Sequence, residues 1–169
     1  MITWPHEVQN ELQAFYGKFQ LGANGTPTET WKAKNLTTFI APYPLTLSWD
    51  LTKTATRVTC HKAVAGSLKT ILQGILAHYG SLAEIKKARM HLYGGCYEFR
   101  NIGGSHTLSL HAYGAAIDLD PENNPRGKKY QEGIGMIPRA VVDIFEAQGW
   151  KWGGKFSTKP DCMHFQATS

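Results

Sequence analysis

The chain has 169 residues, of which 42% are hydrophobic and 18% are charged, and its formal net charge is +5. These values fit one globular domain over residues 1–169 and exclude a largely disordered chain. No apolar run reaches the 18 or more residues of a transmembrane helix, and the first residues lack the pattern of a signal peptide. We therefore expect synthesis in the cytoplasm.

The first part of the chain predicts one helix, an irregular stretch and a short strand. Residues 5–16 begin with a proline and end before Gly17, which can stop a helix. The apolar residues at helical spacing, and hence on the expected inner face, are Val8, Leu12 and Phe15. Residues 21–44 are rich in turn residues and predict no regular element, whereas residues 46–50 predict a short strand.

The remainder predicts two further helices and several short strands. The clearest helix covers residues 61–79, because its apolar residues recur every three or four positions and Gly80 follows as a C-cap. Another helix covers residues 138–148, with a proline at its start. Strands are expected at residues 90–93, 116–119 and 163–165, the last paired with a strand after Trp150. The predicted fold class is α+β: a small antiparallel sheet with packed helices.

Residues 109–120 contain side chains suited to a metal site. His111 and Asp118 lie seven residues apart, with small residues between them. Imidazole nitrogens and carboxylate oxygens bind zinc, and a catalytic zinc ion keeps three protein ligands and one open position. His164 is the candidate third ligand, and Asp161 is then free to act as a base. Each pattern alone occurs by chance in many chains, but their co-occurrence favours a zinc site.

These residues resemble the M15 family of zinc peptidases. That family includes D-alanyl-D-alanine carboxypeptidases and dipeptidases, and the L-alanyl-D-glutamate endopeptidases of bacteriophage endolysins. Its first motif, Ser-x-His-x-x-Gly-x-Ala-x-Asp, matches at Ser109, His111, Gly114, Ala116 and Asp118. Its second, Asp-x-x-His-Phe, matches at Asp161, His164 and Phe165. The motif-bearing core spans about residues 60–166. Gln166 stands where many members have glutamate, a difference that we expect to touch no metal ligand.

The resemblance implies the fold shared by D,D-peptidases and Hedgehog-like domains. It also implies one catalytic zinc ion, bound by His111, Asp118 and His164. Asp161 would then be the catalytic base, taking a proton from a zinc-activated water and passing it to the leaving amine.

Further residues are expected to contact the substrate. In the family, an arginine upstream of the first motif contacts the substrate and helps to stabilise the oxyanion, and Arg100 is the candidate here. A structural ion pair is the alternative role for this side chain. Ser109 resembles the motif serine that bonds the substrate backbone or its terminal carboxylate. Ser105 and His106 are expected to line the approach.

The implied substrate is the stem peptide of bacterial peptidoglycan. The compact length and the lack of wall-anchoring repeats favour a monomeric phage endolysin, an L-alanyl-D-glutamate endopeptidase that reaches the wall after release and lyses the host. A D-alanyl-D-alanine carboxypeptidase or dipeptidase is the enzymatic alternative. A non-catalytic, zinc-containing module that binds the cell wall is the alternative from another class, and the intact Asp161 argues against it.

Positive side chains gather at residues 86–89 and 126–129, and at Lys151, Lys155 and Lys159. The chain lacks zinc-finger spacing, an arginine-rich helix and an aromatic RNA-binding signature, so nucleic acid is not an expected partner. The clusters either attract the protein to a polyanionic bacterial envelope or form a solvated surface. Both interpretations stay open.

Two other groups of residues carry potential metal ligands. The loop after the first motif carries oxygen donors, including Asp120 and Glu122, that suggest a calcium site but lack the spacing of an EF-hand. The three cysteines, an odd number, do not predict a disulfide framework. Cys162 lies near His164 and can bind metal in principle, but packing as a small apolar residue is the favoured role.

Overall fold

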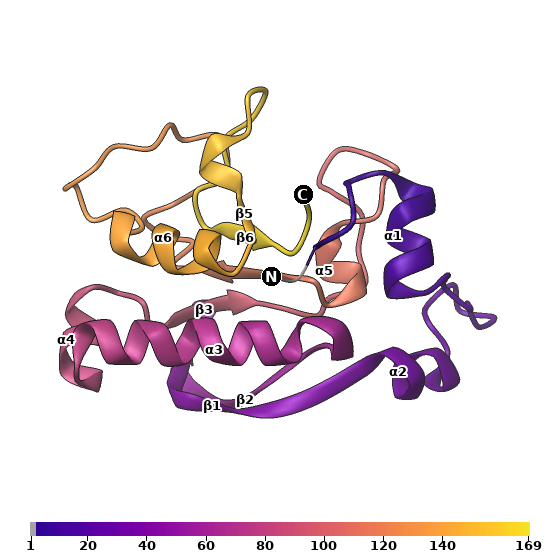
Figure 1. Ribbon diagram of the computed structural model, residues 1–169, viewed down its shortest axis with the longest axis horizontal. Helices are drawn as coiled ribbons and strands as arrows, with labels where there is room; N and C mark the ends of the chain where they lie inside the picture. Colours follow the sequence, from indigo (N-terminus) through magenta and orange to yellow (C-terminus); the bar gives the residue numbers. More distant parts are fainter. Residues whose placement is uncertain (1–2) are drawn as a thin grey trace.

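The computed structural model describes residues 3–169 and is built on one six-stranded sheet (Figure 1). The strands are β1 (Leu36–Leu47), β2 (Asp50–His61), β3 (Leu92–Gly95), β4 (Ala116–Leu119), β5 (Lys151–Trp152) and β6 (His164–Gln166). The helices are α1 (Gln9–Tyr16), α2 (Glu29–Asn35), α3 (Lys62–Tyr79), α4 (Leu82–Lys87), α5 (Leu110–Tyr113) and α6 (Arg139–Ala147), with a 3₁₀ turn, η1, at Gly153–Lys155. Across residues 3–169, no helix has the length and apolar character needed to cross a membrane.

The strand order is β2-β1-β3-β4-β6-β5, and the sheet is mixed. Neighbouring strands run antiparallel except β1 and β3, which are parallel. The parallel pair arises because α3 and α4 carry the chain back across the sheet before β3 begins. The predicted α+β class is confirmed, with this one departure from an antiparallel sheet.

The prediction for residues 21–50 is confirmed at both ends but wrong for residues 29–44. Residues 21–28 are irregular as expected, but α2 and the long β1–β2 hairpin follow. Residues 46–50 cover the end of β1, the hairpin turn and the first residue of β2. Pro42 and Pro44 suggest breaks in regular structure, but they lie where the register between β1 and β2 shifts, and there a missing N–H is tolerated. Strand β2 is at the sheet edge and half of its residues are exposed, so it lacks an apolar alternation.

The predicted helix at residues 61–79 is confirmed as α3, with His61 as its N-cap and Gly80 as a left-handed C-cap. It packs against β1 and α6 through a fully buried apolar stripe that includes Leu68 and Ile71. Burying each such side chain contributes roughly 1.5–3 kcal/mol. Helix α3 therefore supplies a large part of the hydrophobic core that packs against the sheet.

Helix α6 confirms the prediction at residues 138–148 and holds the C-terminal strand. Phe145 on α6 stacks on Phe165 of β6, with ring centroids 3.8 Å apart.

Helix α1 begins later than predicted, at Gln9. Of its expected inner face only Leu12 is buried, whereas Val8 and Phe15 are exposed.

Candidate metal centre

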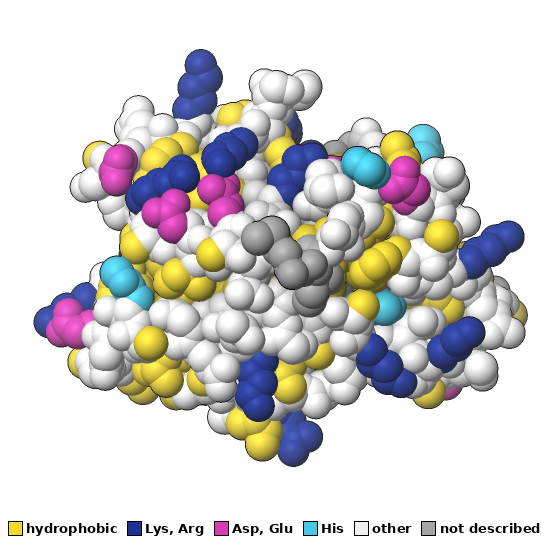
Figure 2. Space-filling model, in the orientation of Figure 1, with side chains coloured by type: hydrophobic (Ala, Val, Ile, Leu, Met, Phe, Trp, Pro, Cys, Tyr) yellow, Lys and Arg dark blue, Asp and Glu magenta, His cyan; other side chains and the backbone are white. Residues whose placement is uncertain are grey.

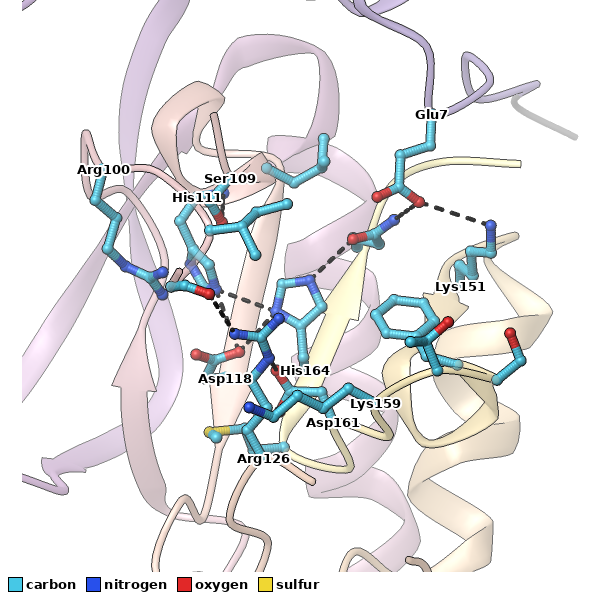
Figure 3. Close-up of a pocket in the computed structure, with 18 residues that line it drawn as sticks. Glu7, Arg100, Ser109, His111, Asp118, Arg126, Lys151, Lys159, Asp161 and His164 are labelled. Carbon is cyan, nitrogen blue, oxygen red and sulfur yellow. Dashed lines mark hydrogen bonds and ion pairs between the residues drawn. The ribbon is translucent and has the colours of Figure 1, made fainter. Parts of the chain in front are cut away.

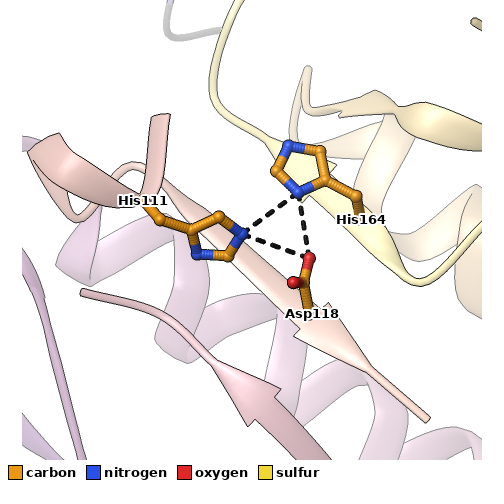
Figure 4. Close-up of side chains that lie close together, drawn as sticks. All are labelled: His111, Asp118 and His164. Carbon is orange, nitrogen blue, oxygen red and sulfur yellow. Dashed lines mark hydrogen bonds and ion pairs between the residues drawn. The ribbon is translucent and has the colours of Figure 1, made fainter. Parts of the chain in front are cut away.

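Three buried side chains from two distant parts of the chain meet beside the sheet (Figure 4). His111 comes from α5, Asp118 from β4 and His164 from β6. His111 Nε2 lies 3.2 Å from both His164 Nδ1 and Asp118 Oδ1. His164 Nδ1 lies 2.9 Å from Asp118 Oδ1. The three atoms form a nearly equilateral triangle.

This triangle fits a zinc ion. Ligand atoms bonded to tetrahedral zinc at about 2.0–2.1 Å lie about 3.3 Å from one another, close to the spacings seen here. The other nitrogen of each ring has a carbonyl partner: His111 Nδ1 donates to the Cys96 carbonyl at 2.8 Å, and His164 Nε2 donates to Gln166 Oε1 at 3.0 Å. Both rings therefore present a lone pair to the carboxylate, and only a shared cation or proton relieves that repulsion.

The pKa values of the ligands reflect this proximity. Burial alone would raise the pKa of Asp118, but His111 and His164 hold it well below its usual range. Burial alone would lower the pKa of His164, but its bonds to Asp118 and Gln166 raise it above the ordinary value. The hydrogen bond between Gln166 and His164 also contradicts the expectation that residue 166 touches no metal ligand.

Local backbone geometry explains the spacing of the motif. Ser109 caps the short helix α5, with its Oγ accepting from the His111 backbone N–H at 3.3 Å. Gly114 ends the helix in the left-handed region, at a φ of 70°, and turns the chain into β4. Asp118 then lies directly opposite His164 in the β4–β6 register. The short helix α5, the turn at Gly114 and the pairing of β4 with β6 thus bring the three candidate ligands together.

Gly114 should be intolerant of any side chain. A Cβ there would lie 2.8 Å from the His61 backbone nitrogen, besides requiring a positive φ. We expect Gly114→Ala to lower the free energy of unfolding by about 2–4 kcal/mol. Gly80→Ala is the matched control, because φ is 74° but nothing lies within 4 Å, so it should cost only about 1–2 kcal/mol. Denaturant unfolding measures both, and equal losses would contradict the role assigned to the close contact.

Asp161 lies beside the triangle with a free carboxylate oxygen. Among the described residues its buried Oδ1 has no hydrogen-bond partner, while Oδ2 lies 3.7 Å from Arg126 Nε. Its backbone N–H donates to the Gly153 carbonyl at 2.9 Å, and a Cβ on Gly153 would lie 2.5 Å from the Asp161 carbonyl oxygen. A buried acceptor without a partner favours a bound donor such as water.

Burial and the charge of Asp118 raise the pKa of Asp161, and His164 and Arg126 oppose them. The net shift is upward. The carboxyl group is therefore suited to exchange a proton closer to neutral pH than an exposed aspartate would be.

The candidate centre opens into a cleft of about 690 Å³ (Figure 3). This volume falls within the roughly 300–1,000 Å³ typical of ligand sites. Four cationic side chains border it: Arg100, Arg126, Lys151 and Lys159. In the sequence, three of them, Arg126, Lys151 and Lys159, belong to the basic clusters and to no motif. On the face shown in Figure 2, by contrast, Lys and Arg are scattered and several lie beside acidic groups.

Of the residues predicted to contact substrate, two line the cleft and two do not. Arg100 lines the cleft, and its Nε donates to Glu98 Oε2 at 2.7 Å, so the ion pair considered as the alternative is present. A guanidinium has five N–H donors, and this pair does not exclude a substrate contact. Ser109 also lines the cleft. Ser105 and His106 lie outside its lining, on the loop at 101–108, where His106 borders a second cavity; their roles stay predictions.

The loop after the first motif uses its oxygen donors internally. Arg89 donates to both carboxylate oxygens of Asp120, at 2.8–3.0 Å, and to Glu122 at 2.6 Å. Arg89 therefore already pairs with both carboxylates that the calcium hypothesis requires as ligands. Cys162 is buried, its thiol is free, and its Sγ lies 3.6 Å from the Lys128 carbonyl oxygen, outside the group of three ligands.

Residues 103–167 match the M15 family model described as D-alanyl-D-alanine carboxypeptidase. The match supports an M15 peptidase. M15 peptidases are zinc-dependent, and the matched segment contains the three converging side chains and Asp161. No curated protein and no solved structure matches the chain. The M15 resemblance therefore rests on the motif-bearing segment, and the match suggests a peptidase that acts on peptidoglycan.

Proposed function

We propose that this protein is a zinc-dependent endopeptidase that cuts the L-alanyl-D-glutamate bond of the peptidoglycan stem peptide, as phage endolysins of the M15 family do. The observation that carries the proposal is the triangle of His111, Asp118 and His164, beside an Asp161 carboxylate oxygen that has no hydrogen-bond partner within residues 3–169. All four residues come from one chain, so the proposal needs no second copy. The place of action would be the bacterial cell wall.

The geometry suggests a division of work among the side chains. His111, Asp118 and His164 would hold the zinc ion, which supplies a Lewis acid that acidifies water and polarises the scissile carbonyl. Asp161 accepts the proton of the attacking water and then donates it to the leaving amine, a cycle that its raised pKa favours. Arg100 borders the same cleft and would stabilise the negative charge that develops on the carbonyl oxygen.

The shape of the cleft supports an endopeptidase over a carboxypeptidase. A second cavity of about 330 Å³ shares Glu7, Ile102 and Leu110 with the lining of the cleft, and it would suit a substrate chain that extends past the candidate centre. The side chains of Arg100 and Arg126 are 39% and 35% exposed, and this access to solvent suits a substrate chain that continues past the cleft better than an enclosed terminal carboxylate. A D-alanyl-D-alanine carboxypeptidase remains the second candidate, because the matched family model carries that description.

Digestion of purified peptidoglycan by the zinc-loaded protein tests the proposed bond. Mass spectrometry and N-terminal labelling should reveal new D-glutamyl ends, and these should disappear when zinc is removed with a chelator. Released D-alanine would instead identify a carboxypeptidase. Binding to the wall without cleavage, at full zinc occupancy, would favour the non-catalytic module.

The pH dependence of the reaction should report on Arg126. A carboxylate next to a cation has a lowered pKa, and Arg126 is one of the groups that restrain the rise in the pKa of Asp161. Removing that charge in Arg126→Gln should raise the pKa of Asp161 further. Because the base must be deprotonated, the acidic limb of kcat/KM should move to higher pH, measured on a soluble stem peptide. A limb that stays in place or moves to lower pH would contradict this assignment.

A further inference from the structure

A chain of hydrogen bonds links the candidate centre to the segment before α1 (Figure 3). Gln166 Oε1 accepts from His164 Nε2 at 3.0 Å. Gln166 Nε2 donates to Glu7 Oε2 at 2.8 Å and to Thr168 Oγ1 at 2.7 Å. Lys151 Nζ lies 3.7 Å from the same Glu7 oxygen. Because Gln166 is buried, its amide is shielded from water and depends on these protein partners for its hydrogen bonds.

The carboxylate of Glu7 decides which way this amide points. A carboxylate only accepts hydrogen bonds, and so it binds the NH₂ end of Gln166 and turns the carbonyl end toward His164. The Thr168 hydroxyl donates or accepts equally well, and therefore it does not distinguish the two orientations. Of the two groups that Gln166 Nε2 contacts, only Glu7 imposes a direction.

The direction of the amide determines the tautomer of His164. With Oε1 facing the ring, the imidazole proton sits on Nε2, and Nδ1 offers its lone pair to the triangle. With the amide reversed, NH₂ would face Nε2, and the neutral ring would carry its proton on Nδ1. That proton would occupy the position of the ligand atom. Partners of this kind, which orient a metal-binding histidine, commonly change metal affinity by about 10–100-fold when removed.

We propose that Glu7 is a positioning residue of the metal centre, which selects, through Gln166, the tautomer of His164 that binds zinc. The inference rests on the proposed zinc site but not on the peptide bond that is cleaved. Glu7 lies outside the segment that matches the M15 model, 159 residues from Gln166. The segment before α1 thus contributes to a centre whose ligands all lie beyond residue 110.

Zinc affinity, measured by competition with a chelator, tests the proposal. We expect Glu7→Ala to weaken binding about tenfold and Gln166→Met about 10–100-fold. The double variant should bind as weakly as Gln166→Met alone, because Glu7 acts only through the amide. Glu11→Ala is the matched control: this carboxylate also lies in the N-terminal region, but it pairs with His6 and should leave affinity unchanged.

Nitrogen-15 spectra of metal-free protein at alkaline pH give a second readout, one that a general loss of packing would not reproduce. The unchanged chain should show His164 with its proton on Nε2, whereas Glu7→Ala should show a mixture of tautomers. Unchanged zinc affinity and an unchanged tautomer in Glu7→Ala would overturn the proposal, even if Gln166→Met fails to fold. Effects that add in the double variant would also overturn it. If the unchanged chain itself binds no zinc, the proposed function fails instead.

Discussion

Asp161→Asn should retain zinc and lose activity. The amide has nearly the shape of the carboxyl group but cannot take up the proton of the attacking water, and a positioned acid or base contributes about 10²–10⁴-fold to a rate. Asp161 is not part of the group of three converging ligands, so metal affinity should be little changed. The measurement is kcat on a stem peptide, with zinc content determined on the same samples.

Asp143→Asn is the matched control for this loss. Asp143 lies on α6, its side chain is 58% exposed, and it pairs with Arg139 on the same helix. The substitution makes the same chemical change outside the cleft lining, and it should keep the full rate. An Asp161→Asn protein that binds zinc and hydrolyses the peptide at the original rate would disprove the assigned role of the base.

His164→Ala should abolish both zinc binding and the stability that zinc provides. A ligand that binds only the folded state stabilises it by RT ln(1 + [L]/Kd), which is about 4.1 kcal/mol when free zinc is a thousand times Kd. Without His164 only two ligands remain, and the bridge between the β4 and β6 parts of the site is lost. Thermal unfolding with and without zinc measures the difference.

The control for this substitution is His78→Ala. His78 is exposed in the last turn of α3, and removing it should leave the zinc-dependent shift in Tm unchanged. A His164→Ala protein that still shows the full shift would place the bound metal elsewhere. The two variants together separate a specific site from adventitious binding to surface histidines.

The elements that sequence reasoning found are those with one dominant buried face. Helix α3 shows a continuous apolar stripe, and α6 is bounded by a proline and a glycine. Strand β2 shows no such pattern, because it lies at the sheet edge and half of its residues are exposed to solvent. In β1, Pro42 and Pro44 lack the backbone N–H of a regular strand, and a shift in register accommodates them. Burial, rather than strand propensity, separates the predicted elements from the missed ones.

The candidate site likewise contains residues that the sequence predicts and residues that only the structure reveals. His111, Asp118, Asp161 and His164 lie in two short motifs whose spacing is set by local turns and one strand pair, so a sequence pattern suffices to find them. Glu7 meets Gln166 only in the folded chain, and no local pattern links the two. Arg126 is likewise brought to Asp161 by tertiary structure. The supporting residues of the centre therefore became visible only in three dimensions.

The most direct test of the account is a zinc titration of the metal-free protein, followed by hydrolysis of a peptidoglycan stem peptide at each step. We expect no hydrolysis at the start, a rise that is complete at one zinc ion per chain, and no rise in the His164→Ala protein. Full hydrolysis by the metal-free chain, or a rise that survives in His164→Ala, would contradict a catalytic zinc ion at His111, Asp118 and His164.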